Sequence, residues 1–267
     1  MVKNEGGYAL KKTLAAAAIA ALAASGAANA ADIYGGLKDA PVAPPPPLWT
    51  GFYIGASVGG AWGDLKTTDT NGAWAPFDRP GYSWENSPSG IIGNGQIGYN
   101  WQLGLLSSGL VIGVEADFGG FGFSGTVHPL NGAYYSDTVS GSFYTDVTGR
   151  LGYALGPTLF YLKGGWAYYD GEISLGDAGY PKGPYGAVGA PYSQRSSGFG
   201  GWTFGGGVEY KFNPKWGGKI EYRYFDFGDF RQNPYATGPW LFDRNFTASA
   251  VTAGINYYVT PVYTPLK

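Results

Sequence analysis

The sequence predicts an all-β protein that folds as one eight-stranded antiparallel transmembrane β-barrel with up-and-down topology. Eight segments alternate between apolar and polar residues with a period of two, which is the period of a β-strand. Short and long connections join these segments in turn, as in barrels with tight turns at one end and long loops at the other. An export signal precedes them, and no later stretch is long and apolar enough for a membrane-spanning helix.

The composition limits the classes of protein to which the chain can belong. Charged residues make up 13% and aromatic residues 17%, which argues against both an ordinary soluble domain and a disordered chain. The formal net charge of −2 does not favour a nucleic-acid partner. Because cysteine is absent, disulfides, zinc–thiolate sites and cysteine nucleophiles are excluded.

Residues 1–30 have the pattern of a cleaved secretory signal peptide. Lys11 and Lys12 precede a short apolar stretch at 14–24, and small residues follow, with an A-x-A cleavage site at Ala28 and Ala30. The alternative is an N-terminal membrane anchor. The apolar stretch disfavours it, because the stretch is too short to span the hydrocarbon as a helix.

The rest of the chain divides into three parts. Residues 31–48 contain the run APVAPPPP, which predicts an extended proline-rich periplasmic segment. The barrel is expected at 49–259, and a short C-terminal extension at 260–267. A spacer and a flexible tether are both compatible with the proline-rich segment.

The eight predicted strands follow one another without any helical pattern between them. Most exceed the about 9–11 residues that a tilted membrane strand needs. They are 50–62, 90–103, 109–121, 140–155, 158–170, 198–212, 216–229 and 246–259.

The connections alternate in length. Four are long (64–89, 122–139, 171–197 and 230–245) and are rich in Asn, Asp, Ser, Pro and Gly, as surface loops are. Three are short (104–108, 156–157 and 213–215). We therefore expect four extracellular loops and three periplasmic turns.

The two faces of the strands differ sharply. One face is apolar in strand after strand, as with Ile54, Val114, Leu162 and Phe204. The other is polar, charged or glycine-rich, and it is predicted to line the lumen with five acids and five bases. This lumen charge network consists of Glu115, Asp117, Asp146, Arg150, Lys163, Glu209, Lys211, Lys219, Glu221 and Arg223.

A soluble, lipocalin-like barrel would show the same alternation with its faces reversed. Three features favour the membrane alternative. Glycines share the charged face, which suits a crowded small lumen. The two signs of charge balance, as they would if they had to pair. Aromatic residues gather near the strand ends, as interfacial girdles do, for example Trp62, Trp101, Trp166, Trp202 and Trp216.

The hairpin around residues 213–215 fixes a register. A three-residue loop places Lys211 opposite Gly217, and Glu209 opposite Lys219. Moving the strands by two residues would set like charges opposite one another, which is unfavourable. The expected register therefore predicts an ion pair between Glu209 and Lys219.

Several stretches resemble a known family. WTGFYIGASVGGAW, GQIGYNWQ, VIGVEADF, GRLGYALG, GGGVEYKFNPKW and KIEYRYFDFGD are similar to the RopB-like small outer-membrane porin family of alphaproteobacteria, in order along the barrel. The resemblance implies an OmpA-like eight-stranded barrel in the Gram-negative outer membrane. It also implies contact with outer-membrane lipid and lipopolysaccharide, and leaves the oligomeric state open.

The last strand resembles the signal that the outer-membrane assembly machinery reads. The matching residues are Thr252, Gly254, Tyr257 and Val259. Family members usually end at a terminal aromatic residue, whereas TPVYTPLK follows here. This departure concerns how the signal is presented rather than the fold.

Motifs that could carry chemistry are sparse. GNGQIG at 93–98 has the spacing of a dinucleotide-binding loop, but the strand continues after it where a helix is needed. His128 is the one histidine, and Ser136 and Asp137 lie in the same predicted loop. A single imidazole without a fixed partner argues against catalysis, haem binding and a metal site. We expect no cofactor.

The favoured function is structural and surface-related, in a barrel whose lumen is plugged by charged side chains. The alternative is a narrow or gated porin for small solutes or ions, although an aqueous channel of the porin type needs about 16 strands. A barrel enzyme acting on lipid A or peptides is the third hypothesis.

The membrane-barrel fold predicts heat-modifiable migration. Protein extracted in mild detergent should run differently on a denaturing gel before and after boiling, because a closed barrel resists SDS until it is heated. Identical mobility, together with solubility in detergent-free buffer, would favour the soluble barrel instead.

Overall fold

The computed structural model describes residues 49–72, 80–103, 108–128, 135–177, 192–196, 198–232 and 241–259. The predicted signal peptide with Ala28 and Ala30, the proline-rich segment at 31–48 and the extension at 260–267 lie outside these residues. Within the described residues, no helix is long and apolar enough to cross a membrane.

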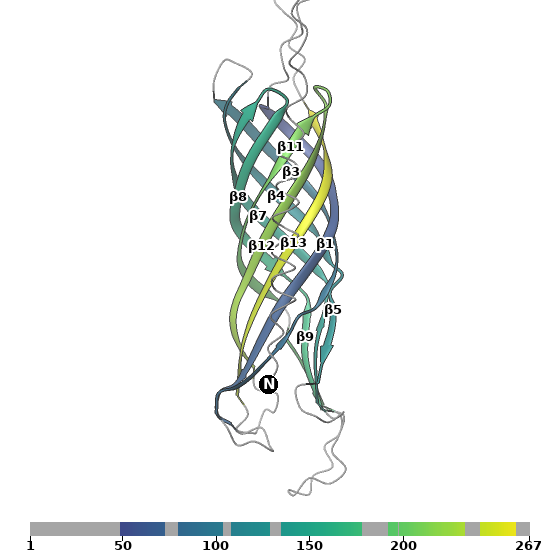
Figure 1. Ribbon diagram of the computed structural model, residues 1–267, viewed down its shortest axis with the longest axis vertical. Helices are drawn as coiled ribbons and strands as arrows, with labels where there is room; N and C mark the ends of the chain where they lie inside the picture. Colours follow the sequence, from purple (N-terminus) through teal and green to yellow (C-terminus); the bar gives the residue numbers. More distant parts are fainter. Residues whose placement is uncertain are drawn as a thin grey trace, which may run out of the picture. The chain divides into compact units, whose positions relative to one another are not determined.

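Eight strands close into an antiparallel barrel, as predicted (Figure 1). Each pairs with its neighbour along the chain, and β1 pairs with both β3 and β13 to complete the ring. The barrel strands are β1 (Gly51–Asp69), β3 (Ser89–Leu103), β4 (Ser108–Phe121), β7 (Phe143–Leu155), β8 (Thr158–Tyr169), β11 (Phe199–Lys211), β12 (Trp216–Gln232) and β13 (Phe242–Val259).

The outer surface of the ring carries the predicted apolar face. One central residue from each strand shows the pattern, and each is 40–62% exposed on the outside of the barrel. Apolar side chains exposed to this extent are favourable in contact with lipid and unfavourable in contact with water. These residues are Val58, Ile97, Val114, Val147, Leu162, Phe204, Ile220 and Ile255. Rings such as Trp101 and Trp216 lie toward the end with short turns, which we call the turn end.

The long connections contain more regular structure than the sequence predicts. Five further strands form in them, namely β2 (Tyr82–Asn86), β5 (Ser124–Val127), β6 (Tyr135–Ser140), β9 (Glu172–Asp177) and β10 (Tyr192–Ser196). In addition, β1 runs seven residues past the predicted end at Trp62, since it reaches Asp69, and β13 begins at Phe242 rather than Phe246. Residues 140–142 do not belong to the fourth barrel strand, which begins at Phe143.

The change of environment explains these missed segments. Beyond Trp62, Asp64 and Lys66 point outward while Leu65 is buried inside. An outer face that meets water instead of lipid no longer needs apolar residues. The alternation therefore changes from apolar outside to polar outside, although the strand continues.

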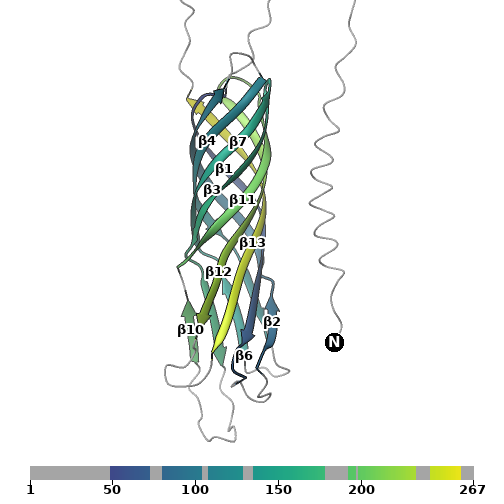
Figure 2. The same cartoon turned by 90° about the vertical axis from the view of Figure 1, so that its left-hand side faces the viewer.

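At the end that bears the long connections, called the loop end, the sheet separates into two leaves. The β1 leaf consists of β2 and the outer parts of β1, β13 and β12, and the β6 leaf consists of β5, β6, β9 and β10. Figure 1 shows β12, β13 and β1 reaching the lower left, while β5 and β9 reach the lower right; Figure 2 shows β2, β6 and β10 at the same end.

The lipid face can be tested with a matched pair of substitutions. Ile220→Arg on β12 should lower the free energy of unfolding by about 2–4 kcal/mol, because it places a cation near the middle of the outer wall. Thr68→Arg, which points outward on the β1 leaf, should cost about 0–1 kcal/mol. Urea unfolding in lipid vesicles measures both, and equal costs would contradict the assigned faces.

Candidate functional site: the interior of the barrel

Trp49 covers the turn end of the bore. Its side chain is fully buried, although it precedes the first strand. Its backbone N–H donates to Gln102 Oε1 at 2.9 Å, and its indole N–H donates to the Gly156 carbonyl at 3.1 Å. Its ring meets the edge of Tyr258, with centroids 5.8 Å apart. Trp49 therefore spans the mouth from β3 to the turn between β7 and β8.

The ten residues of the predicted lumen charge network all lie inside the barrel. Each is at most 3% exposed, and they come from β4, β7, β8, β11 and β12. Inward placement follows from the alternation of side chains along each strand. Buried charges at this density must pair with one another, because an unpaired ion in such a site is costly.

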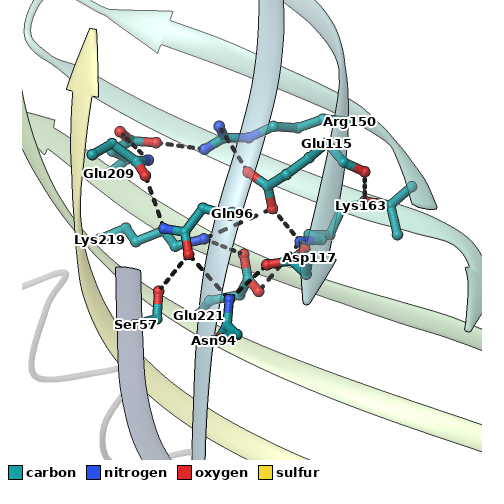
Figure 3. Close-up of polar contacts among 12 residues, drawn as sticks. Ser57, Asn94, Gln96, Glu115, Asp117, Arg150, Lys163, Glu209, Lys219 and Glu221 are labelled. Atoms are coloured by element: carbon teal, nitrogen blue, oxygen red, sulfur yellow. Dashed lines mark hydrogen bonds and ion pairs between the residues drawn. The ribbon is translucent and has the colours of Figure 1, made fainter. Parts of the chain in front are cut away.

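Glu115 is the centre of this network (Figure 3). One carboxylate oxygen accepts a hydrogen bond from Tyr53 Oη at 2.6 Å. The same oxygen lies 3.9 Å from Arg150 Nη1. The other accepts a hydrogen bond from Lys163 and lies 3.8 Å from Lys219 Nζ. A single carboxylate on β4 thus faces cations from β7, β8 and β12.

Asp117, two residues further along β4, extends the pairing toward the loop end. It accepts from Lys163 Nζ at 2.7 Å and from Asn94 Nδ2 at 2.7 Å. Arg223 Nη1 lies 3.4 Å away, and the same guanidinium bonds Asp146 on β7. The charges are therefore connected across the bore rather than in separate pairs.

Glu221 closes the network from β12. Its carboxylate accepts from Tyr161 Oη at 2.7 Å. Three cationic nitrogens surround it, from Lys219 at 3.5 Å and from Lys163 and Arg223 at 3.6 Å each.

Amide side chains link the charges to the remaining strands. Glu209 accepts from Arg150 Nη2 at 2.7 Å, from Asn256 Nδ2 at 2.8 Å and from Tyr258 Oη at 2.6 Å. Gln96 Nε2 donates to Asn256 Oδ1 at 2.8 Å. These contacts bring β3 and β13 into the network.

Lys211 lies at the turn-end side of the network. Its ammonium nitrogen stands 3.5 Å from the ring centroid of Tyr258 and 4.8 Å from that of Trp49. Cation–π contacts of this kind stabilise a partly desolvated ammonium group. Lys211 therefore connects the charged layer to the Trp49 cover.

The predicted register of the β11–β12 hairpin is correct, but the predicted Glu209–Lys219 ion pair is wrong. The two residues are opposite one another in the ladder. Glu209 nevertheless pairs with Arg150, and Lys219 lies nearest Glu221 and Glu115. In a narrow bore all inward side chains approach the axis, so partners from distant strands compete with the ladder neighbour.

An aromatic layer lies between the charged network and the loop end. Its rings pack with centroids 4.6–6.4 Å apart, within the range of favourable aromatic contacts. It consists of Phe121, Phe123, Tyr144, Tyr169, Phe225, Phe227 and Phe246. Arg223 joins the two layers, since its guanidinium carbon lies 4.8 Å from the Phe225 ring centroid.

A second buried polar cluster joins the two leaves. The Asp137 carboxylate on β6 accepts from Thr67 Oγ1 at 3.1 Å, from Trp84 Nε1 at 2.9 Å and from Arg244 Nη2. Asn86 Nδ2 donates to the Asp137 carbonyl at 2.9 Å. The donors belong to β1, β2 and β13, whereas the acceptor belongs to the β6 leaf.

The remaining candidate residues fall in separate places. His128 is exposed just after β5, and the carboxylate of Asp137 is occupied by the leaf contacts. In the described residues, no group of three or more His, Cys, Asp or Glu side chains could hold a metal ion.

The four residues of the assembly motif lie on both faces of β13. Thr252 points into the bore, and a side chain at Gly254 would meet Ser57. Tyr257 packs its ring against Trp216 at 5.0 Å, and Val259 is exposed on the outer wall.

Sequence reasoning missed several interior residues. Tyr53 and Tyr161 share the charged face, but the predicted network contains only charged residues, so their hydrogen bonds to Glu115 and Glu221 were missed. Trp49 precedes the alternating pattern and so carried no inward signal. Asp137 and Arg244 are 107 positions apart, and no local pattern could have paired them.

Comparisons with known proteins agree with this architecture. Residues 14–258 match the family model described as the outer membrane protein beta-barrel domain. The chain is 31% identical over 252 residues to the 31 kDa outer-membrane immunogenic protein of Brucella melitensis, covering 92% of this chain and 99% of the relative. It is 30% identical over 218 residues to the 22 kDa outer membrane protein of Rhizobium leguminosarum bv. viciae, covering 82% and 81%.

Solved structures show only a distant likeness. OprG from Pseudomonas aeruginosa aligns with a TM-score of 0.47 and 14% identity, over 80% of this chain and 99% of that one. The outer membrane protease OmpT from Escherichia coli aligns with a TM-score of 0.37 and 13% identity, over 78% and 96%. The family match and the two relatives confirm the predicted resemblance to small outer-membrane barrels.

The observed pairing can be tested by double-mutant cycles. Arg150→Met should destabilise the barrel by about 3–5 kcal/mol, because it leaves the buried Glu209 carboxylate without its cation. Combined with Glu209→Gln, it should show a coupling of about 0.5–3 kcal/mol in urea unfolding. The control cycle, Lys219→Met with Glu209→Gln, should give a smaller coupling. A larger coupling in the control would contradict the observed pairing.

Proposed function

This chain belongs to the family of outer membrane protein β-barrel domains, and we propose that it serves as a structural, surface-presenting protein whose bore is closed to solutes. In the outer membrane the turn end faces the periplasm and the loop end faces the exterior. The proposal has two parts, which concern the bore and the exposed leaves.

The observation that carries the first part is the buried network of five acids and five bases. An eight-stranded barrel encloses a bore that side chains can fill. Here the carboxylates of Glu115 and Glu221 pair with all three inward-facing cations on β8 and β12, namely Lys163, Lys219 and Arg223. A solute entering from either side would have to displace paired charges, which is energetically costly. Trp49 at the turn end and the aromatic layer toward the loop end add two further barriers.

The second part rests on the two leaves, which lie beyond the lipid belt, that is, beyond the part of the barrel wall whose outer face is apolar. On the β1 leaf, Asp64 and Lys66 of β1 and Glu85 of the neighbouring β2 point outward, as does Asp229 of β12 on the other side of β13. Such a polar sheet suits contact with water and with other molecules rather than with lipid. The Brucella relatives are named immunogenic, which supports surface presentation as an antigen for this chain as well.

The proposal includes two partners besides the phospholipid that surrounds the belt. The outward rings and aliphatic side chains suit lipopolysaccharide in the outer leaflet. The β13 motif of Thr252, Gly254, Tyr257 and Val259 suits recognition by the outer-membrane assembly machinery. No nucleic-acid partner is proposed.

We propose no enzymatic role. His128 is exposed, and Asp137, the neighbouring carboxylate, is engaged by Arg244 inside the leaf contact. The relatives from Brucella and Rhizobium are named as outer-membrane proteins and not for a reaction, which supports a non-enzymatic role over the lipid A and peptide hypotheses.

A narrow or gated pore is the second candidate. It is favoured by one observation, namely that Lys219 Nζ is buried without a hydrogen-bond partner while two carboxylates lie 3.5 and 3.8 Å away. A loosely held ammonium group could exchange partners and open a path past Glu221.

Planar-bilayer recording distinguishes the two candidates. The refolded wild-type barrel should give no discrete conductance steps, whereas Arg150→Ala combined with Arg223→Ala should give them, because two long side chains leave the bore. Arg231→Ala removes a cation from the exposed surface and serves as the control. Stable steps from wild-type protein that is heat-modifiable on gels would overturn the closed-bore proposal.

A further inference from the structure

The two leaves at the loop end are not joined by a backbone ladder in the described part of the chain. The sheet order begins β10-β9-β6-β5 and ends β12-β13-β1-β2, so the leaves lie at its opposite ends. Toward the leaves the ladder between β3 and β4 continues only through one hydrogen bond, from the Gly122 N–H to the Ile91 carbonyl at 2.7 Å, and one pair, Ser89 with Ser124. The ladder between β11 and β12 stops at Trp202 and Asp226. Side chains must therefore hold the leaves together.

The connections of the β6 leaf to the barrel differ from those of the β1 leaf. Each of the four chain segments that enter or leave the β6 leaf passes through a glycine, namely Gly122, Gly141, Gly171 and Gly198. Gly198 has a φ of 85°, which other residues rarely adopt. In contrast, β1 and β13 run without interruption from the barrel into the β1 leaf. The root of the β1 leaf has one comparable position, Gly228 at the bulge of β12, with a φ of 73°. Glycines in all four connections therefore distinguish the root of the β6 leaf, and such positions absorb hinge motions.

One carboxylate closes the gap between the leaves. Asp137 is fully buried and receives donors from three strands of the β1 leaf, through Thr67, Trp84 and Arg244. Arg244 is fixed in turn, because its Nη1 donates to Gln232 on β12 at 2.6 Å and its Nε donates to Thr67 at 3.0 Å. All four strands of the β1 leaf thus converge on a single residue of the β6 leaf.

The β6 leaf covers apolar surface. Val139 on β6 and Ile173 on β9 are fully buried, and they belong to the same apolar cluster as Phe121, Phe246 and Leu65. When the leaf is closed, these residues separate the aromatic layer from water. Outward displacement of the leaf would bring the aromatic layer into contact with the exterior and leave the contacts of the charged network in place.

We propose that the β6 leaf is a hinged flap, which the Asp137–Arg244 contact latches shut over the aromatic layer. The four glycines at its root are its hinge. Loss of the latch permits the flap to open without unfolding the barrel, because the barrel ladders end below it. The inference goes beyond the closed bore, since the flap can open whether or not the charged network conducts.

Thiol labelling tests the proposal, and the absence of native cysteine gives it a clean background. A cysteine is introduced at Val139, under the flap, and its reaction with a water-soluble maleimide is followed in detergent micelles. The latch variants Asp137→Asn and Arg244→Met should each raise the labelling rate about tenfold or more, because a buried charge loses its partner. Arg231→Gln removes an exposed ion pair with Asp243 and should leave the rate unchanged.

A second reporter separates flap opening from general loosening. Thr252→Cys lies in the bore beside the charged network, and its labelling rate should stay at the parent value in both latch variants. Equal acceleration at both reporters would overturn the proposal, as would unchanged labelling at position 139. If a latch variant fails to refold, heating the parent gives the same comparison. The reporter at 139 should then react at a lower temperature than the reporter at 252.

Discussion

Every backbone amide that lies in hydrocarbon must bond to another strand, and the rest of this structure depends on that constraint. An open sheet would leave edge groups unpaired in lipid, so β1 pairs with β3 on one side and with β13 on the other. Closure with eight strands then fixes a narrow bore. It also divides the side chains into an outer apolar set and an inner set that must satisfy itself. The separation of the sheet into leaves occurs only beyond the outward lipid belt, where water can bond to free edges.

The narrow bore determines how the inner charges combine. Side chains from every direction reach the same axis, so a carboxylate such as Glu115 contacts cations from three other strands. Pairing therefore follows distance across the bore rather than position in a ladder. This arrangement leaves few isolated ion pairs, and a substitution at one strand affects partners on several others. Two apolar layers, one around Trp49 and one around Phe121, keep water away from both ends of this network. The attraction between its opposite charges is therefore stronger than it would be in water.

The alternation of residues and the lengths of the loops predicted those features of the fold that depend on local sequence alone. The inward and outward faces, and the register between Glu209 and Lys219, follow from alternation and loop length, and the structure has both. The choice of Arg150 as the partner of Glu209 depends on the geometry of the closed ring, which alternation does not contain. The extension of β1 to Asp69 was missed because Asp64 and Lys66 reverse the polarity of the outer face once the wall leaves the membrane. The latch between Asp137 and Arg244 joins segments that are distant in sequence, and only the folded leaves bring them together.

The ladder between β1 and β13 has a consequence for the order of events during biogenesis. It joins the two ends of the barrel chain, from Phe52 with Val259 to Asp69 with Phe242. All the other barrel ladders join barrel strands that follow one another along the chain, and each can form as soon as both of its strands are present. This one has to wait until the final strand has been exported, and the entropy of closing so long a loop must be overcome at that moment. Until then the first strand exposes an unpaired edge, so the nascent protein needs protection from aggregation throughout its passage across the periplasm.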